Sequence, residues 1–187
     1  LLARDGRALP LLVMAVVVVV WGIGPPISQL IPASPLISTF IRFGISSPIL
    51  LLLLAVRGRT LGWRVFRSTP LPGLCFGFNL IFVFAAVQQT AISLLSTVMA
   101  MQPALLLVLS GPLFGERPSM RQLFFTLSGV GGAVLVVLGA GGDLSASLTG
   151  LGYAGLSLVT FTAYFVLTRQ ARTGHEVGPI EWMAGIH

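Results

Sequence analysis

The chain has 187 residues, of which 55% are hydrophobic and only 9% are charged, and its mean hydropathy is +0.97. Soluble domains carry about 25% charged residues, so this composition excludes an ordinary soluble globular protein. The net charge of +6 comes from arginine alone, and the single cysteine, Cys75, excludes an intrachain disulfide.

Six apolar segments follow one another along the chain. As a helix, each is long enough to cross a hydrocarbon core of about 30 Å, which needs about 20 residues. The segments are residues 8–31, 35–56, 70–90, 91–114, 121–140 and 150–170. The sequence therefore predicts an all-α fold, a polytopic bundle of transmembrane helices with six spans in this chain.

Small polar residues and prolines mark where several of these helices begin. Ser34-Pro35 and Thr69-Pro70 each combine a capping side chain with a proline at the first helical position. Thr90 is a similar capping residue before the fourth span. These signals predict short connections, and the third and fourth spans are expected to form a tight hairpin.

The end of the fourth span carries further signals. Pro103 is expected to kink this helix, because proline removes a backbone hydrogen bond, and Gly115 is expected to stop it. Ser119 and Gln122 have the spacing of a capping box, which predicts that the next helix starts at once. For Glu116, an ion pair with a neighbouring arginine (Arg117 or Arg121) is favoured over a role in proton coupling.

The arginines fall on alternate connections. Ten of the eleven lie on connections of one side or at the helix ends next to them: Arg4, Arg7, Arg57, Arg59, Arg64, Arg67, Arg117, Arg121, Arg169 and Arg172. The connections of the other side contain no arginine and only Asp143. The positive-inside rule then predicts that the N-terminus and the arginine-rich connections are cytoplasmic. The same pattern excludes nucleic acid as a partner, since no soluble basic surface is present.

The connection 57–69 allows two interpretations. Trp63 and Phe66 would lie among lipid headgroups, with the arginines toward anionic lipid, if this segment is an interfacial amphipathic piece. An ordinary cytoplasmic loop fits the sequence equally well.

Several local motifs occur in a characteristic order along the chain. They are Trp21-Gly22, Arg42-Phe43, a small-residue run into Pro103, Gly115-Glu116-Arg117 with Gln122, and the glycine-rich helix LSGVGGAVLVVLG. In this order the motifs resemble the EamA-type members of the drug/metabolite transporter superfamily. Gly24-Pro25-Pro26 departs from the family pattern by its additional prolines.

The resemblance implies ten helices, built as two inverted five-helix repeats, in a bacterial inner (plasma) membrane. On this basis residues 8–140 are the first repeat, 141–149 an outer loop, and 150–187 the first helix and following loop of a second repeat. The chain is thus expected to be a fragment of a longer protein. The implied function is transport, with export favoured, of amino acids or other small metabolites by alternating access.

Polar residues at membrane depth are the candidates for a substrate site, because a polar side chain in hydrocarbon is costly unless it faces protein or water. Trp21, Asn79, Gln102 and Thr160 each lie roughly 13–17 Å from a helix end, near the midplane where transporters place their sites. Arg42, about 10 Å below the outer surface by the same count, is the only charged residue inside a span. It would hold a substrate carboxylate or phosphate; the structural alternative is that it snorkels or binds carbonyls at a broken helix end.

The sequence argues against an enzyme, because the spans lack the catalytic and metal-binding residues that an enzyme would require. His175 and His187 both lie near the C-terminal end, so neither a Ser–His pair nor a histidine metal site is expected within the membrane. No P-loop is present, and no cofactor is expected. The expected partners are a small-molecule substrate and the bilayer, with a homodimer left open. The alternative function is a non-transporting membrane subunit or scaffold whose polar residues only pack helices.

Overall fold

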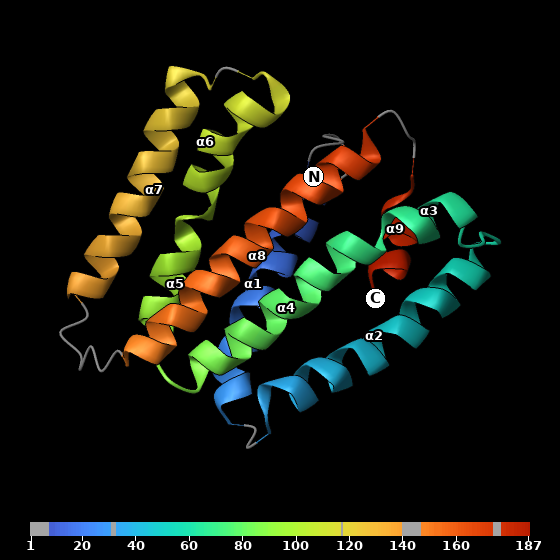
Figure 1. Cartoon of the computed structure of the whole chain (residues 1–187), viewed down its shortest axis with the longest axis horizontal. Helices are drawn as coiled ribbons and strands as arrows, with labels where there is room; N and C mark the ends of the chain where they lie inside the picture. The colour runs from blue at the N-terminus through green and yellow to red at the C-terminus, as the bar shows by residue number, and fades with distance from the viewer. Residues whose placement is uncertain (1–7, 31–32, 117, 140–146, 174–176) are drawn as a thin grey trace. The chain divides into compact units, whose positions relative to one another are not determined.

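The computed structural model describes residues 8–30, 33–116, 118–139, 147–173 and 177–187, and over these residues the only regular secondary structure is α-helix (Figure 1). The helices are α1 (Ala8–Gln29), α2 (Pro35–Val56), α3 (Trp63–Ser68), α4 (Pro70–Val87), α5 (Ile92–Ala100), α6 (Gln102–Phe114), α7 (Met120–Gly139), α8 (Leu148–Arg172) and α9 (Pro179–Ile186). The all-α prediction is confirmed. Helix α1 lies in one compact unit, Leu1–Pro32, and the remaining helices lie in a second, Ala33–His187.

Five segments are long and apolar enough to cross a membrane. They are Leu11–Ser28, Pro35–Val56, Pro70–Val87, Ile92–Phe114 and Leu148–Arg172. Each corresponds to a predicted span. The sixth prediction, 121–140, is observed as helix α7, but over the described residues it is not among the five, so a crossing by α7 remains a prediction.

The most extensive packing in the larger unit joins α4 to α8, which lie side by side (Figure 1). On α8 the buried residues recur at helical spacing, and all but Leu158 are small or polar: Gly150, Ala154, Ser157, Leu158 and Thr162. Such a stripe lets two helix backbones approach closely. Gly150 lies close to the connection that follows α4, because a Cβ atom there would lie 2.8 Å from the carbonyl oxygen of Gln89.

A second packing region holds α9 and the short helix α3 against α4. Val65, Phe76, Leu80, Trp182 and Ile186 form its buried apolar core. Glycines permit the contact: a Cβ on Gly73 would lie 2.9 Å from the carbonyl oxygen of Ile186. Trp182 is only 2% exposed because it belongs to this core.

The helix caps agree with the sequence at some positions and not at others. The Ile37 amide donates to Ser34 Oγ at 3.3 Å, so the predicted cap of α2 is present. Thr69, in contrast, makes no capping bond to α4; its hydroxyl donates instead to the Val65 carbonyl at 2.9 Å. Thr90 also fails as a cap, because the N-cap position of α5 is Ala91.

The connection after α6 forms as the sequence predicted. Gly115 ends the helix with a φ of 66°, a left-handed conformation that glycine adopts without strain. Ser119 and Gln122 form both bonds of the capping box, because the Gln122 amide donates to Ser119 Oγ and the Ser119 amide donates to Gln122 Oε1.

Candidate functional site

Asn79 is the centre of a polar network between helices. Its side chain is 2% exposed, and Nδ2 donates to both the carbonyl oxygen and Oγ of Ser157, each at 3.0 Å. Ser157 Oγ in turn lies 3.3 Å from Met99 Sδ. The network therefore ties α4 to α8 and α5, and it satisfies the amide donor that would otherwise be costly at this depth.

Thr160 joins the same network through its backbone partners. Its hydroxyl donates to the carbonyl oxygens of Leu156 at 2.8 Å and Ser157 at 3.0 Å. The Ser157 carbonyl consequently accepts from both Asn79 and Thr160, so two of the predicted site residues meet at one acceptor. Ser157 was not among the site residues predicted from the sequence, although its position among the small residues of α8 could have indicated a helix contact.

Gln102 lies where the fourth predicted span is interrupted. This span consists of two helices, α5 and α6, separated at Met101, whose amide donates to the Val98 carbonyl at 3.1 Å. Pro103 explains the interruption because it has no amide hydrogen to continue the helical ladder. The predicted kink is confirmed, and Gln102 Nε2 is buried there without a hydrogen-bond partner in the described part of the chain.

Arg42 lies apart from this network. It belongs to α2, which packs mainly on α4 and α9, and its side chain is exposed. Its backbone carbonyl accepts a hydrogen bond from Ser46 Oγ at 2.8 Å. The structure thus brings Asn79 and Thr160 together at the Ser157 carbonyl, while Arg42 lies on a helix that contains neither of them.

Trp21 belongs to α1, and the backbone there is helical as expected. Its side chain lies outside the described residues, and α1 belongs to the other compact unit. A role for Trp21 in substrate binding therefore stays a prediction.

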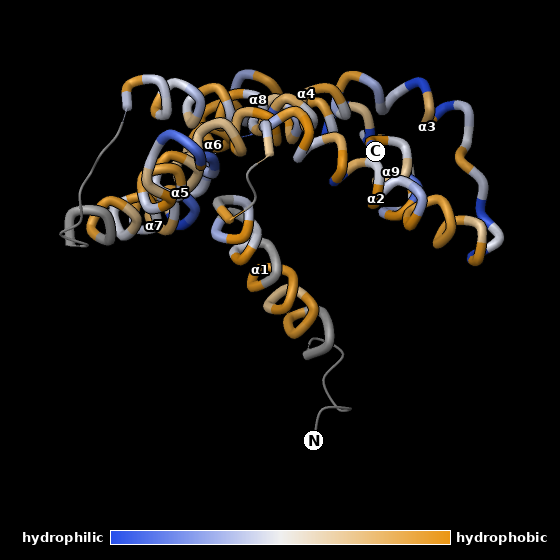
Figure 2. Tube along the Cα trace, turned by 90° about the horizontal axis from the view of Figure 1, so that it is seen from below, coloured by the Kyte–Doolittle hydropathy of each residue, from blue (hydrophilic) through white to orange (hydrophobic). Residues whose placement is uncertain are grey.

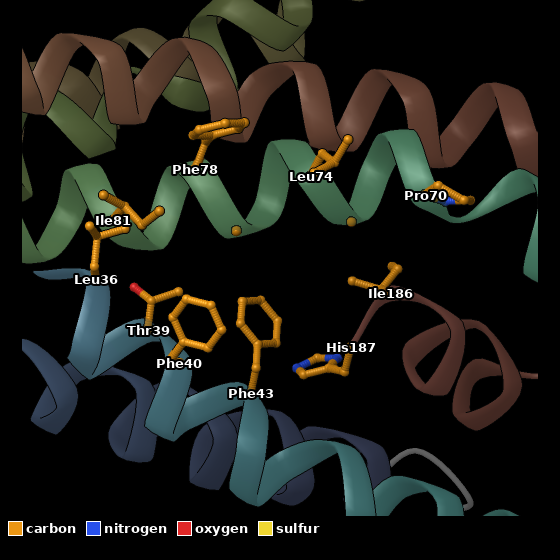
Figure 3. A pocket seen from close by; sticks show the side chains of 12 residues that line it. Leu36, Thr39, Phe40, Phe43, Pro70, Leu74, Phe78, Ile81, Ile186 and His187 are labelled. Carbon is orange, nitrogen blue, oxygen red and sulfur yellow. The ribbon is translucent and has the colours of Figure 1, made fainter.

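A separate apolar pocket of about 540 Å³ lies between α2, α4 and α9 (Figure 3). Phe40 and Phe43 of α2 line it together with Leu74 and Phe78 of α4. Of the predicted site residues whose side chains the structure describes, none lines this pocket. The aromatic residues of α2 were not recognised in the sequence, because on a lipid-exposed helix they look the same as residues that face lipid.

Glu116 pairs with a partner that the sequence analysis did not name. Its carboxylate accepts two hydrogen bonds from Arg169 at the end of α8, one of them 3.0 Å long, and the guanidinium lies 4.0 Å from the Phe114 ring centroid. The prediction of an ion pair for Glu116 is confirmed, but the described partner is Arg169 and not Arg121. Arg117 lies outside the described residues, so a pair with it stays a prediction. Hydrogen bonds from Arg169 lower the pKa of Glu116.

Among the described residues no group of three or more histidine, cysteine, aspartate or glutamate side chains could hold a metal ion. The polar network instead consists of an amide, hydroxyls, a thioether and carbonyl groups. Such groups can orient a small molecule by hydrogen bonds, and they supply no nucleophile–base pair for covalent chemistry.

Comparison with known families gives one assignment. Residues 8–138 match the EamA-like transporter family, a family of transporters rather than enzymes. No curated protein and no solved structure matches the chain. Since the match extends over more than half of the sequence, and the helices are long and apolar enough to cross a membrane several times, the chain belongs to the EamA-like transporter family of multi-pass membrane proteins.

Proposed function

We propose that this transporter exports amino acids or other small metabolites by alternating access, with Trp21, Arg42, Asn79, Gln102 and Thr160 as its substrate-binding residues. Residues 8–140 would be the first of two inverted five-helix repeats, followed by an outer loop at 141–149 and the start of the second repeat at 150–187. The membrane would be a bacterial inner membrane, and the one-sided arginines support a cytoplasmic N-terminus.

The observation that carries this proposal is the interruption of a membrane span at Gln102. Secondary transporters build their sites from discontinuous helices near the midplane, where unwound backbone and helix ends can bind a solute. Here α5 ends at Ala100 and α6 begins at Gln102, roughly in the middle of Ile92–Phe114. A buried amide without a partner is costly, so Gln102 Nε2 is a donor suited to a solute carboxylate or carbonyl oxygen.

The alternative is a scaffold whose polar residues only hold helices together. The contacts of Asn79 favour a packing role for this residue, because both hydrogens of its side-chain amide have acceptors on Ser157. Gln102 distinguishes a transporter from a scaffold, because a residue that only packs helices would need a hydrogen-bond partner for its side-chain amide.

Water accessibility of position 102 tests the proposal. In a Cys75→Ala background of the full chain, Gln102→Cys is reconstituted into vesicles and treated with a charged, membrane-impermeant thiol reagent. Val108→Cys is the matched control on the same helix, because Val108 is apolar and 72% exposed, as expected for a residue that faces lipid. We expect position 102 to react from water and position 108 not to react.

A candidate amino acid that is transported should also slow the reaction at position 102. If a folded Gln102→Cys protein stays as unreactive as Val108→Cys with the reagent on either side, the residue lies in a sealed helix contact. That result would contradict the proposed site and favour the scaffold.

A further inference from the structure

The connection between α2 and α4 contains a short helix that is fixed to the protein on one side only. Helix α3, Trp63–Ser68, buries Val65, which is 6% exposed, in the core that also contains Trp182. Thr69, the residue after α3, is 1% exposed, and its hydroxyl donates to the Val65 carbonyl. These contacts hold α3 in a defined orientation, which a flexible loop would not have.

The orientation leaves two large aromatic rings outside the protein. Trp63 is 70% exposed and Phe66 is 52% exposed, and their rings are stacked with centroids 5.5 Å apart. With about 100° of rotation per residue, both lie on the face of α3 away from Val65. Tryptophan and phenylalanine on such a face are typical of residues that enter the headgroup region of a bilayer.

Arginines lie beside this aromatic face. Arg64 and Arg67 are exposed and three residues apart, so they share one side of α3, and Arg57 is exposed where α2 ends. Figure 2 shows strongly hydrophilic positions, in blue, interspersed with hydrophobic ones around α3. Glu181 lies 3.9 Å from Arg59, whereas no carboxylate among the described residues pairs with Arg57, Arg64 or Arg67.

We propose that α3 is a binding surface for anionic lipid headgroups, with Trp63 and Phe66 inserted into the headgroup region and Arg64 and Arg67 bound to lipid phosphates. The rigid placement through Val65 presents both groups to the same leaflet. Guanidinium groups form paired hydrogen bonds with phosphate oxygens, and an anionic surface attracts clustered arginines more strongly than a neutral one. The interfacial alternative for residues 57–69 is thereby favoured over an ordinary loop.

The experiment uses the full chain in vesicles of phosphatidylcholine and phosphatidylglycerol in equal amounts, with the lipids that stay bound after mild extraction identified by mass spectrometry. We expect enrichment of phosphatidylglycerol with the natural sequence. Arg64→Gln/Arg67→Gln should reduce the enrichment by about fivefold for each arginine removed. Arg64→Lys/Arg67→Lys, which conserves the charge, should keep most of it.

A second readout reports on α3 itself. Lipids brominated near the headgroup should quench the fluorescence of Trp63. This fluorescence is the difference between the signal of each protein and that of its Trp63→Phe variant. Arg64→Gln/Arg67→Gln should weaken this quenching, whereas Arg121→Gln, which removes an exposed arginine from the start of α7, should leave it unchanged.

Two results would overturn the proposal. The first is a bound-lipid composition that the arginine substitutions leave unchanged, together with Trp63 fluorescence that headgroup-brominated lipid does not quench. This combination would make the segment an ordinary loop. The other is displacement of phosphatidylglycerol by inorganic phosphate more effectively than by chloride at equal ionic strength, which would assign the arginines to a soluble anion.

Discussion

Single polar residues at membrane depth have different surroundings in this protein, although the sequence presents them alike. Asn79 and Thr160 both have partners in the protein, on the same Ser157 carbonyl, while Gln102 Nε2 has none in the described part of the chain. Sequence reasoning can place such residues by depth, because a helix rises 1.5 Å per residue. It cannot assign their partners, since these depend on which helices meet.

Replacing Asn79 by alanine should destabilise the protein. Interhelical hydrogen bonds in membranes are worth about 0.6 kcal/mol on average, and Asn79→Ala removes two of them and leaves a small void. We expect a loss of about 1–2 kcal/mol, measured by thermal or denaturant unfolding in detergent. Ser157→Ala is the matched control: it removes Oγ but keeps the carbonyl acceptor, so its loss should be smaller.

A loss from Asn79→Ala no larger than that from Ser157→Ala would contradict this description of the network. It would mean that the carbonyl bond contributes nothing measurable to the contact of α4 with α8.

The Glu116–Arg169 pair should make stability depend on pH. Arg169 lowers the folded-state pKa of Glu116, so the stabilisation is fully present above the pKa of an unfolded glutamate and is lost as pH falls through the lowered value. Glu116→Gln should therefore lower the melting temperature at neutral pH and have little effect in acid below the folded-state pKa.

The measurement is a double-mutant cycle with Arg169→Gln at the two pH values. A coupling between the two residues at neutral pH that vanishes in acid is expected. Equal coupling at both pH values would show that the effect does not come from the glutamate charge.

At the level of elements, Gly150 allows the start of α8 to pack closely on the connection between α4 and α5. A Cβ at Gly150 would lie 2.8 Å from Gln89 O and 2.9 Å from Thr90 Cβ, so Gly150→Ala must push α8 away from the end of α4. Overpacking of this kind costs about 1–3 kcal/mol. Gly152→Ala is the control, because no atom lies within 4 Å of its Cβ position.

Unfolding in detergent checks this pair of variants. Gly152→Ala should be neutral or stabilising by up to about 1 kcal/mol, since alanine favours helix. If Gly150→Ala is as stable as Gly152→Ala, the close approach of α8 to the α4–α5 connection does not limit this position.

Helix ends show which element-level features the sequence specified. The capping box at Ser119 and Gln122 was predictable because both partners lie within one turn. Thr69 was misassigned because the same hydroxyl has a second acceptor, the carbonyl of Val65 in α3, a helix that the sequence analysis did not resolve. The break at Met101 followed from Pro103, whereas the pairing of Glu116 with Arg169 spans 53 positions and could not be read locally.

At the scale of the whole molecule, the membrane class and the family followed from composition, the order of motifs and the one-sided arginines. The family match over residues 8–138 confirms that assignment. For the candidate site, the sequence could predict only the depth of each residue in the membrane. Which of the five residues meet is decided by tertiary packing, which brings Asn79 and Thr160 together at the Ser157 carbonyl.

Transport by the protein in vesicles tests the central claim most directly. Vesicles loaded with unlabelled amino acid are diluted into the labelled amino acid, and counterflow is followed for a panel of amino acids and small metabolites. We predict label accumulation for at least one solute that is abolished by Gln102→Ala and retained by Val108→Ala. Folded protein that gives no counterflow for any solute, or equal counterflow in both variants, would contradict a transport site at the interrupted helix.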